Sequence, residues 1–284
     1  MKIGNYKLSI IETGTLGLDG GAMFGVVPKP LWERTNPADD SNRVKLAARN
    51  LLLEDGKRKI LIDTGVGTNW DDKFKRIYNL DQSKNTLFNS LKTNGVNSDQ
   101  ITDVILTHLH FDHTGGAVIF ENNKILPAFP NAKYYVRKKQ YDWANNPSDR
   151  DKGSFFSERF KPLYEEGILA LINEGHEFED GIELLEINGH TFSQQMVKIS
   201  DSSKTLLYCA DLIPFASHFH IPYVMGYDLQ PLITVLEKKE YLARAVKENW
   251  IIFFEHDPEI VCATVESTGK GYRAKETFKG FPDD

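Results

Sequence analysis

The stretch that decides the fold is Thr107-His108-Leu109-His110-Phe111-Asp112-His113-Thr114-Gly115-Gly116. Within six positions it carries four side chains that commonly bind metal ions, namely His108, His110, Asp112 and His113. The residues before it read as a short apolar strand, so the first two histidines, two positions apart, point to the same side. Imidazole and carboxylate ligands suit Zn²⁺, which needs further ligands from elsewhere in the chain.

Three later side chains, each directly after an apolar strand, are the candidates for those ligands. They are His190 in EINGHT, Asp211 in YCAD and His256 in IIFFEHD. Each alone is compatible with an ordinary hydrogen-bonded polar group at a strand end. Together with the first motif they supply three histidines to one ion and a mixed set to a second. The sequence therefore predicts a binuclear site with two Zn²⁺ per chain.

Composition narrows the class of protein. The chain has 284 residues, with 34 Lys+Arg against 40 Asp+Glu and a net charge of −6. No basic cluster points to nucleic acid or a membrane surface, so we expect a small-molecule substrate. The absence of a signal-type segment and two cysteines within apolar runs, Cys209 and Cys262, favour a cytoplasmic protein.

Many short strands alternate with fewer helices, roughly one helix to two strands. This count favours an α/β fold in which two sheets pack together with helices outside, a four-layer arrangement formed by one domain over residues 1–284. The expected strands span 6–12, 47–53, 59–62, 103–107, 133–136, 183–187, 195–199, 205–209, 250–254 and 260–265. The expected helices span 70–80, 84–93, 138–143, 157–165 and 229–248.

Two long apolar loops, 20–32 and 214–227, either fold back into the core or form the walls of an apolar pocket. They carry most of the side chains expected to contact substrate. His218 and His220 lie in the second loop, and we assign neither to metal. The pocket candidates are Met23, Phe24, Val26, Trp32, Phe192, His218, Tyr223 and Tyr227.

These motifs resemble the metallo-β-lactamase superfamily. The resemblance rests on the histidine motif, on Asn188-Gly189-His190-Thr191, on Cys209-Ala210-Asp211, on Glu255-His256 and on Leu61-Ile62-Asp63-Thr64-Gly65. It implies an αββα sandwich with the metals at one edge between the sheets, and it implies that Asp63 contacts a metal ligand. The spacing and the segments GGAMFGVVPKPLW and PYVMGYD are most similar to the branch of quorum-quenching N-acyl homoserine lactone lactonases and methyl parathion hydrolase.

The chain departs from that branch at two places. The turn after His190 reads Thr191-Phe192-Ser193 where many members have a threonine, a proline and a glycine. Pro214 stands where the better-studied lactonases carry a catalytic tyrosine, three residues after Asp211. Tyr223, Tyr227 and His218 are the candidates to replace it, unless the substrate is not a lactone.

The ligand set predicts a hydrolase. One ion would bind His108, His110 and His190, the other Asp112, His113 and His256, with Asp211 bridging them. A hydroxide shared by the ions would attack an ester or lactone carbonyl, and Asp112 would relay a proton to the leaving group. The expected substrates are N-acyl homoserine lactones with medium to long acyl chains.

Other classes remain open at this stage. A phosphotriesterase or general ester hydrolase would use the same hydroxide. A di-iron redox protein would need a glutamate in place of His110 and a flavin domain. A metal-free binding module is disfavoured because all seven ligands are present. The apolar loops are also compatible with a homodimer.

Overall fold

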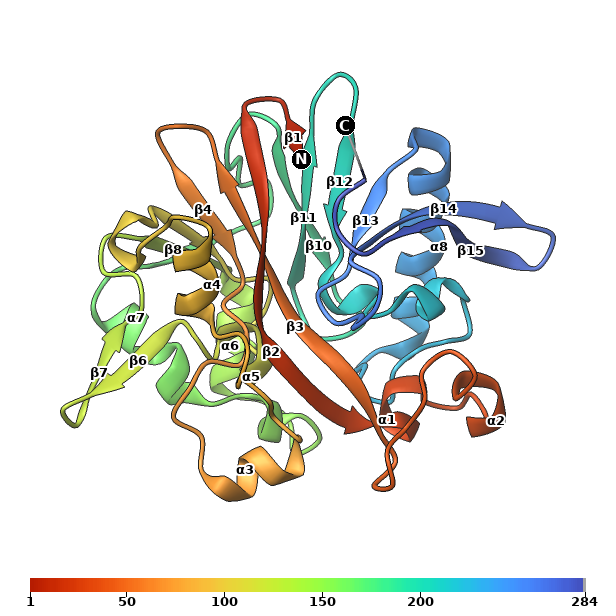
Figure 1. The fold of residues 1–284 in the computed structure, drawn as a ribbon, viewed down its shortest axis with the longest axis horizontal. Helices are drawn as coiled ribbons and strands as arrows, with labels where there is room; N and C mark the ends of the chain where they lie inside the picture. Colours follow the sequence, from red (N-terminus) through yellow and green to blue (C-terminus); the bar gives the residue numbers. More distant parts are fainter. Residues whose placement is uncertain (283–284) are drawn as a thin grey trace.

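The computed structural model describes residues 1–282, in which two large sheets face each other (Figure 1). The first has the order β1-β2-β3-β4-β5-β8-β9 and the second runs from β10 to β15 in chain order. The first comprises β1 Lys2–Ile3, β2 Tyr6–Asp19, β3 Arg43–Glu54, β4 Lys59–Ile62, β5 Asp103–Ile105, β8 Lys133–Arg137 and β9 Leu169–Ile172. The second comprises β10 Ile182–Ile187, β11 Gln194–Ser200, β12 Thr205–Tyr208, β13 Ile251–Phe253, β14 Cys262–Thr268 and β15 Gly271–Phe278.

Helices cover the outer faces of both sheets, so the expected four-layer αββα arrangement is confirmed (Figure 1). The first sheet is covered by α4 Leu87–Thr93, α6 Lys138–Asn145 and α7 Lys161–Glu165, and the second by α8 Pro231–Glu248. Shorter helices are α1 Gly20–Phe24, α2 Lys29–Trp32, α3 Asp72–Ile77 and α5 Phe111–Thr114. No helix among residues 1–282 is long and apolar enough to cross a bilayer.

Alternation along the strands explains the layers. In β4, Ile60 and Ile62 face the second sheet and pack with residues such as Val197 of β11. Leu61 points the other way and packs with Leu91 of α4. Because successive side chains of a strand point to opposite faces, one strand contributes to two cores. The inner core joins the sheets, and the outer cores attach the helices.

Several elements differ from the expected ones. All ten expected strands are present, β4 with the expected bounds and the other nine with shifted ones, but β1, β9, β15 and the hairpin of β6 Val118–Glu121 and β7 Lys124–Pro127 were not expected. β15 was missed because most of its side chains are exposed or half-buried, so its sequence lacks apolar alternation. The expected helix over 70–80 is limited to α3, and the first apolar loop contains α1 and α2.

The topology brings separate strand ends to one edge. β4 pairs in parallel with β5, and β12 pairs in parallel with β13. Asp63 follows β4, His108 lies just after β5, Asp211 lies just after β12 and His256 lies just after β13. Since the carboxyl ends of parallel strands meet at the same edge of a sheet, these side chains converge.

A buried arginine fixes the loop that leaves the histidine motif. The Arg159 guanidinium lies 4.0 Å from the ring centre of Trp70 and 4.4 Å from that of Phe120. Its Nη1 donates to the carbonyls of Thr68 at 2.9 Å and Gly115 at 3.1 Å. One side chain therefore joins the loop after β4 to the end of the histidine motif.

We predict that Arg159→Ala destabilises the fold by about 3 kcal/mol or more, because it leaves the buried Gly115 carbonyl without this donor and removes the buried guanidinium that packs on Trp70 and Phe120. Denaturant unfolding of the variant measures the loss. Lys152→Ala, which removes an exposed side chain that pairs with Asp149, is the control and should change stability by less than about 0.5 kcal/mol. Equal stabilities of the two variants would contradict the prediction.

Candidate metal centre

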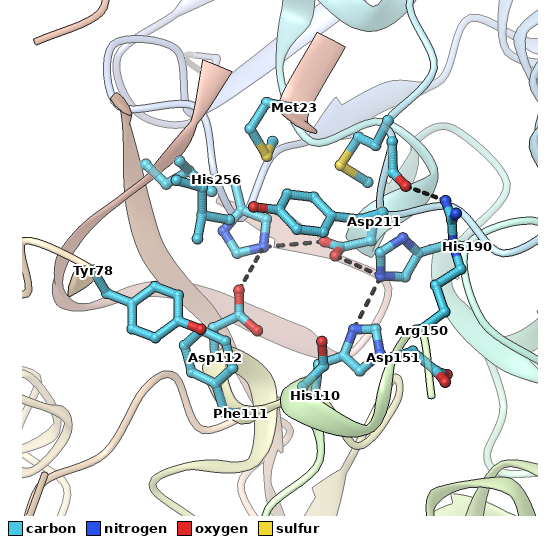
Figure 2. A pocket seen from close by; sticks show the side chains of 16 residues that line it. Met23, Tyr78, His110, Phe111, Asp112, Arg150, Asp151, His190, Asp211 and His256 are labelled. Atoms are coloured by element: carbon cyan, nitrogen blue, oxygen red, sulfur yellow. Dashed lines mark hydrogen bonds and ion pairs between the residues drawn. The ribbon is translucent and has the colours of Figure 1, made fainter. Parts of the chain in front are cut away.

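The first candidate ligand group consists of His108, His110 and His190 with one oxygen of Asp211. Figure 2 shows His110, His190 and Asp211 of this group close together. His110 Nδ1 lies 3.1 Å from the Nε2 atoms of both His108 and His190. Asp211 Oδ2 lies 3.0 Å from His190 Nε2 and 3.8 Å from His108 Nε2. All four side chains are at least nine-tenths buried, so their polar atoms face one another rather than water.

The second ligand group consists of Asp112, His113 and His256 with the other oxygen of Asp211. His113 Nε2 and His256 Nε2 are 3.3 Å apart. Asp211 Oδ1 lies 3.0 Å from His256 Nε2 and 3.4 Å from His113 Nε2. The Asp112 oxygens lie 3.9 Å from each of these nitrogens. The structure thus places the Asp211 carboxylate between the two groups.

The donor geometry fits divalent cations. Around a tetrahedral Zn²⁺ with bonds of about 2.0–2.1 Å to nitrogen, neighbouring ligand nitrogens are about 3.3 Å apart. The nitrogen contacts within each group lie close to that value. Asp211 Oδ1 is buried and has no hydrogen-bond partner in residues 1–282, as expected for an oxygen that serves as a metal ligand.

Four of the five candidate ligand imidazoles are oriented by a contact to Nδ1, the ring nitrogen that does not face the other ligands. Such partners fix the ring and raise its basicity toward a metal. His190 Nδ1 lies 2.9 Å from Asp228 Oδ1, and His113 Nδ1 lies 3.0 Å from both Asp63 Oδ2 and Glu255 Oε2. The other two contacts are His256 Nδ1 with the Ala47 carbonyl at 2.9 Å and His108 Nδ1 with Thr107 Oγ1 at 3.1 Å.

Asp63 contacts the candidate ligand His113, whereas Asp228 and Glu255 were not expected in this role. Glu255 stands next to His256 in the sequence, and this position could have identified it as a residue that contacts a candidate ligand. Asp228 belongs to the loop before α8 and reaches His190 only through the tertiary fold.

The carboxylates of the site favour positive charge on neighbouring groups, as the pKa values of two histidines show. Burial lowers the pKa of His190, but Asp211 and Asp228 outweigh it and raise the pKa to about 10. Burial likewise lowers the pKa of His256, and Asp211 raises it to about 9. Burial raises the pKa of the Asp211 carboxyl, and the surrounding histidines hold it well below its usual range. The folded protein therefore stabilises a carboxylate at Asp211 beside cationic partners.

A cavity of about 300 Å³ opens onto both ligand groups. Its lining residues come from several elements, among them β2, α1, β3 and α5. They are Leu18, Met23, Leu46, Tyr78, His110, Phe111, Asp112, Arg150, Asp151, Ser154, His190, Asp211, Met225, Gly226, Tyr227 and His256. Figure 2 shows the Tyr78 phenol pointing toward Asp112. Of the expected pocket residues, Met23 and Tyr227 line this cavity.

The other expected pocket residues lie elsewhere. Phe24 stacks on Trp32 with ring centres 5.0 Å apart, and both are fully buried behind the cavity wall. His218 Nε2 lies 2.9 Å from the Met23 carbonyl, and burial lowers its pKa to about 3, so the ring is neutral. Tyr223 packs edge-on against Phe24.

Phe192 and Val26 are also absent from the cavity lining. Phe192 packs on Trp143 with ring centres 4.5 Å apart and lines a separate depression. Val26 is 94% exposed, because Gly25 ends α1 with φ of 57° and turns the chain away from the core. The cavity residues that sequence reasoning missed include Tyr78, Arg150 and Ser154.

A two-sheet sandwich with histidines and aspartates clustered at one edge defines the chain as a metal-dependent hydrolase by class. The model of the metallo-beta-lactamase superfamily matches residues 48–256, which is well over half of the chain. The chain therefore belongs to the metallo-beta-lactamase superfamily, as the sequence motifs indicated.

The chain is also similar to named relatives and to solved structures. The N-acyl homoserine lactonase AiiA of Bacillus thuringiensis subsp. kurstaki is 27% identical over 220 residues, covering 73% of this chain and 80% of AiiA. The structure of a probable metal-dependent hydrolase from Staphylococcus aureus has a TM-score of 0.88 and 25% identity, with 98% of each chain covered. The dizinc quorum-quenching lactonase AidC has a TM-score of 0.80 and 22% identity, with 98% of this chain and 97% of AidC covered.

Proposed function

We propose that this chain is a binuclear zinc hydrolase that opens the lactone ring of N-acyl homoserine lactones. The observation that carries the proposal is the position of Asp211, whose two oxygens face two separate histidine groups. The names of AiiA and AidC support the lactone as substrate, and AidC supports two zinc ions.

In this proposal, different side chains of the site have different roles in the reaction. Two bound zinc ions would lower the pKa of a shared water from about 15.7 toward 7 and polarise the substrate carbonyl. Asp112 lines the cavity and has no hydrogen bond from either neighbouring histidine, so its carboxylate is available to accept a proton and pass it to the leaving alkoxide. In the balanced reaction, the ring C–O bond breaks, a bond from water oxygen to the carbonyl carbon forms, and the alkoxide takes a proton.

Tyr78 and Tyr227 are the phenols placed to donate a hydrogen bond to substrate. Both line the cavity, and neither hydroxyl has a hydrogen-bond partner in the part of the chain that the structure describes. Burial raises the pKa of the Tyr78 hydroxyl, as does the nearby Asp112 carboxylate, so the group stays protonated and able to donate. With Pro214 in the place of the lactonase tyrosine, Tyr227 is the better placed of the earlier candidates, since His218 and Tyr223 do not line the cavity.

We predict two zinc ions per chain, because each ligand group offers three protein side chains and a share of Asp211. Elemental analysis of protein purified from zinc-supplemented culture measures the ratio. A reproducible value near one, or near zero, in metal-replete protein would contradict the binuclear assignment.

We predict that Asp211→Ala reduces kcat/KM about 10³-fold or more, whereas Tyr227→Phe reduces it about 10- to 100-fold. The aspartate contributes to both ligand groups, and the phenol contributes one hydrogen bond. Steady-state kinetics with both variants, together with their metal content, makes the comparison. Equal losses would contradict the prediction, because the phenol would then contribute as much to the reaction as the carboxylate between the two groups.

We predict that longer acyl chains lower KM where KM reflects binding, because each buried methylene contributes about 0.8 kcal/mol. Met225→Ala, on the apolar wall, should weaken this dependence while the metal content stays unchanged. Val26→Ala is the matched control, since its exposed side chain does not line the cavity and the dependence should persist.

The substrate assignment is tested with a panel of homoserine lactones, a phosphotriester, an aryl ester and a β-lactam. Turnover of a phosphotriester or aryl ester by zinc-loaded enzyme, without turnover of any homoserine lactone, would overturn the lactonase proposal. It would leave the metallo-hydrolase assignment intact.

A further inference from the structure

Arg150 is the one lysine or arginine among the described residues that lines the cavity. It lies in the segment between α6 and α7, and its side chain is exposed. Nη2 donates to the Gly226 carbonyl and lies 3.4 Å from the Asp228 carbonyl oxygen. Nε and Nη1 make no hydrogen bond, and the guanidinium makes no ion pair, with any residue of 1–282. The N–H groups of Nε and Nη1 are therefore available to a ligand.

The Arg150 guanidinium lies between the first ligand group and the apolar wall of the cavity. Asp228, whose carbonyl lies near Nη2, contacts His190 Nδ1 through its own side chain at 2.9 Å. Figure 2 shows Arg150 on the same side of the cavity as His190. Gly226, which accepts from Nη2, follows Met225, and Met225 belongs to the apolar wall. A substrate that extends from the first ligand group to this wall passes the guanidinium.

The residue after Arg150 holds this part of the loop in place. The Asp151 side chain is buried, and its Oδ2 accepts from Trp143 Nε1 at 2.7 Å. Its Oδ1 accepts from the Ser148 hydroxyl at 2.6 Å. Both carboxylate oxygens are thus bound within the loop, and neither pairs with the guanidinium. A donor fixed in this way before binding loses less conformational freedom when a ligand arrives.

The proposed substrate has a polar group that the metal ions do not bind. In an N-acyl homoserine lactone, an amide is attached to the carbon next to the lactone carbonyl. When this amide leaves water, its oxygen needs a hydrogen-bond donor from the protein. A guanidinium is a strong donor to such an oxygen, because hydrogen bonds with one charged partner are stronger than neutral ones. A lactone with a plain alkyl chain has no acceptor at this position.

We propose that Arg150 donates a hydrogen bond to the amide oxygen of the acyl chain and thereby selects acylated amino lactones over alkyl lactones. The proposal rests on the lactonase function proposed above and names the part of the substrate that this side chain recognises. The amide is not part of the bond that breaks, so the hydrogen bond is equally strong in the bound substrate and in the transition state. Its loss therefore raises KM and leaves kcat nearly unchanged.

The test measures steady-state kinetics of zinc-loaded wild type and Arg150→Met on two substrates. One is N-octanoyl homoserine lactone, and the other is a γ-butyrolactone with an alkyl chain of matched length next to the ring carbonyl. We expect Arg150→Met to lower kcat/KM about 10- to 100-fold for the acylated lactone, through KM, and less than about threefold for the alkyl lactone. Its metal content should equal that of wild type.

Lys152→Ala is the matched control. Lys152 is an exposed residue of the same loop that pairs with Asp149 and does not line the cavity. Both substrates should be turned over by this variant as by wild type.

Equal falls for the two substrates in Arg150→Met would overturn the proposal, because Arg150 would then act only by holding Gly226 and the cavity wall. An unchanged KM for the acylated lactone would also overturn it. Both results leave the lactonase proposal standing, since wild type hydrolyses the homoserine lactone in each case. Failure of zinc-loaded wild type to hydrolyse either lactone would overturn the lactonase proposal and the role of Arg150 together.

Discussion

The site depends on a single carboxylate placed between two clusters of imidazoles. Asp211 lies just after β12, and its oxygens contact His190 on one side and His256 on the other. Without this carboxylate, five buried histidines would lie close together with no anionic group between them. With it, each cluster gains an anionic neighbour, and the two clusters become one connected unit.

The sheets hold this arrangement in place. The ligands come from the ends of strands in both sheets, so their relative positions depend on the inner core that joins the sheets. The loops at this edge also pass very close to one another. A Cβ on Gly67, where φ is +68°, would lie 2.1 Å from the Gly115 carbonyl oxygen, so only glycine allows the two loops to approach this closely. Arg159 then ties the same loops together from the other side.

Much of this organisation could be predicted from the sequence because it follows from short-range rules. His108 and His110 share a side because they stand two positions apart after a strand, and the carboxyl ends of parallel strands meet at one edge. Which side chains line the cavity could not be predicted from such rules. Val26 and Met23 lie in one apolar segment, yet Gly25 turns the first into solvent and leaves the second at the cavity. The ring of Tyr78, just after α3, packs on Phe74 four residues earlier and on Phe111 of the histidine motif, and the second of these contacts joins distant segments that no local pattern encodes.

The residues proposed to carry out the reaction and the residues that shape the substrate cavity are also held in place in different ways. The ligands and their partners are almost all buried and fixed by strand ends, which favours a geometry that tolerates little variation. Loops form part of the cavity wall: Arg150 donates to the Gly226 carbonyl, and the Gly226 amide donates to the carbonyl of Ala22 in α1 at 2.7 Å. Three segments distant in sequence thus meet above the ligands through a few hydrogen bonds. A change in any one of them would reshape the space offered to substrate while the ligand groups, held by the sheets, stayed in place.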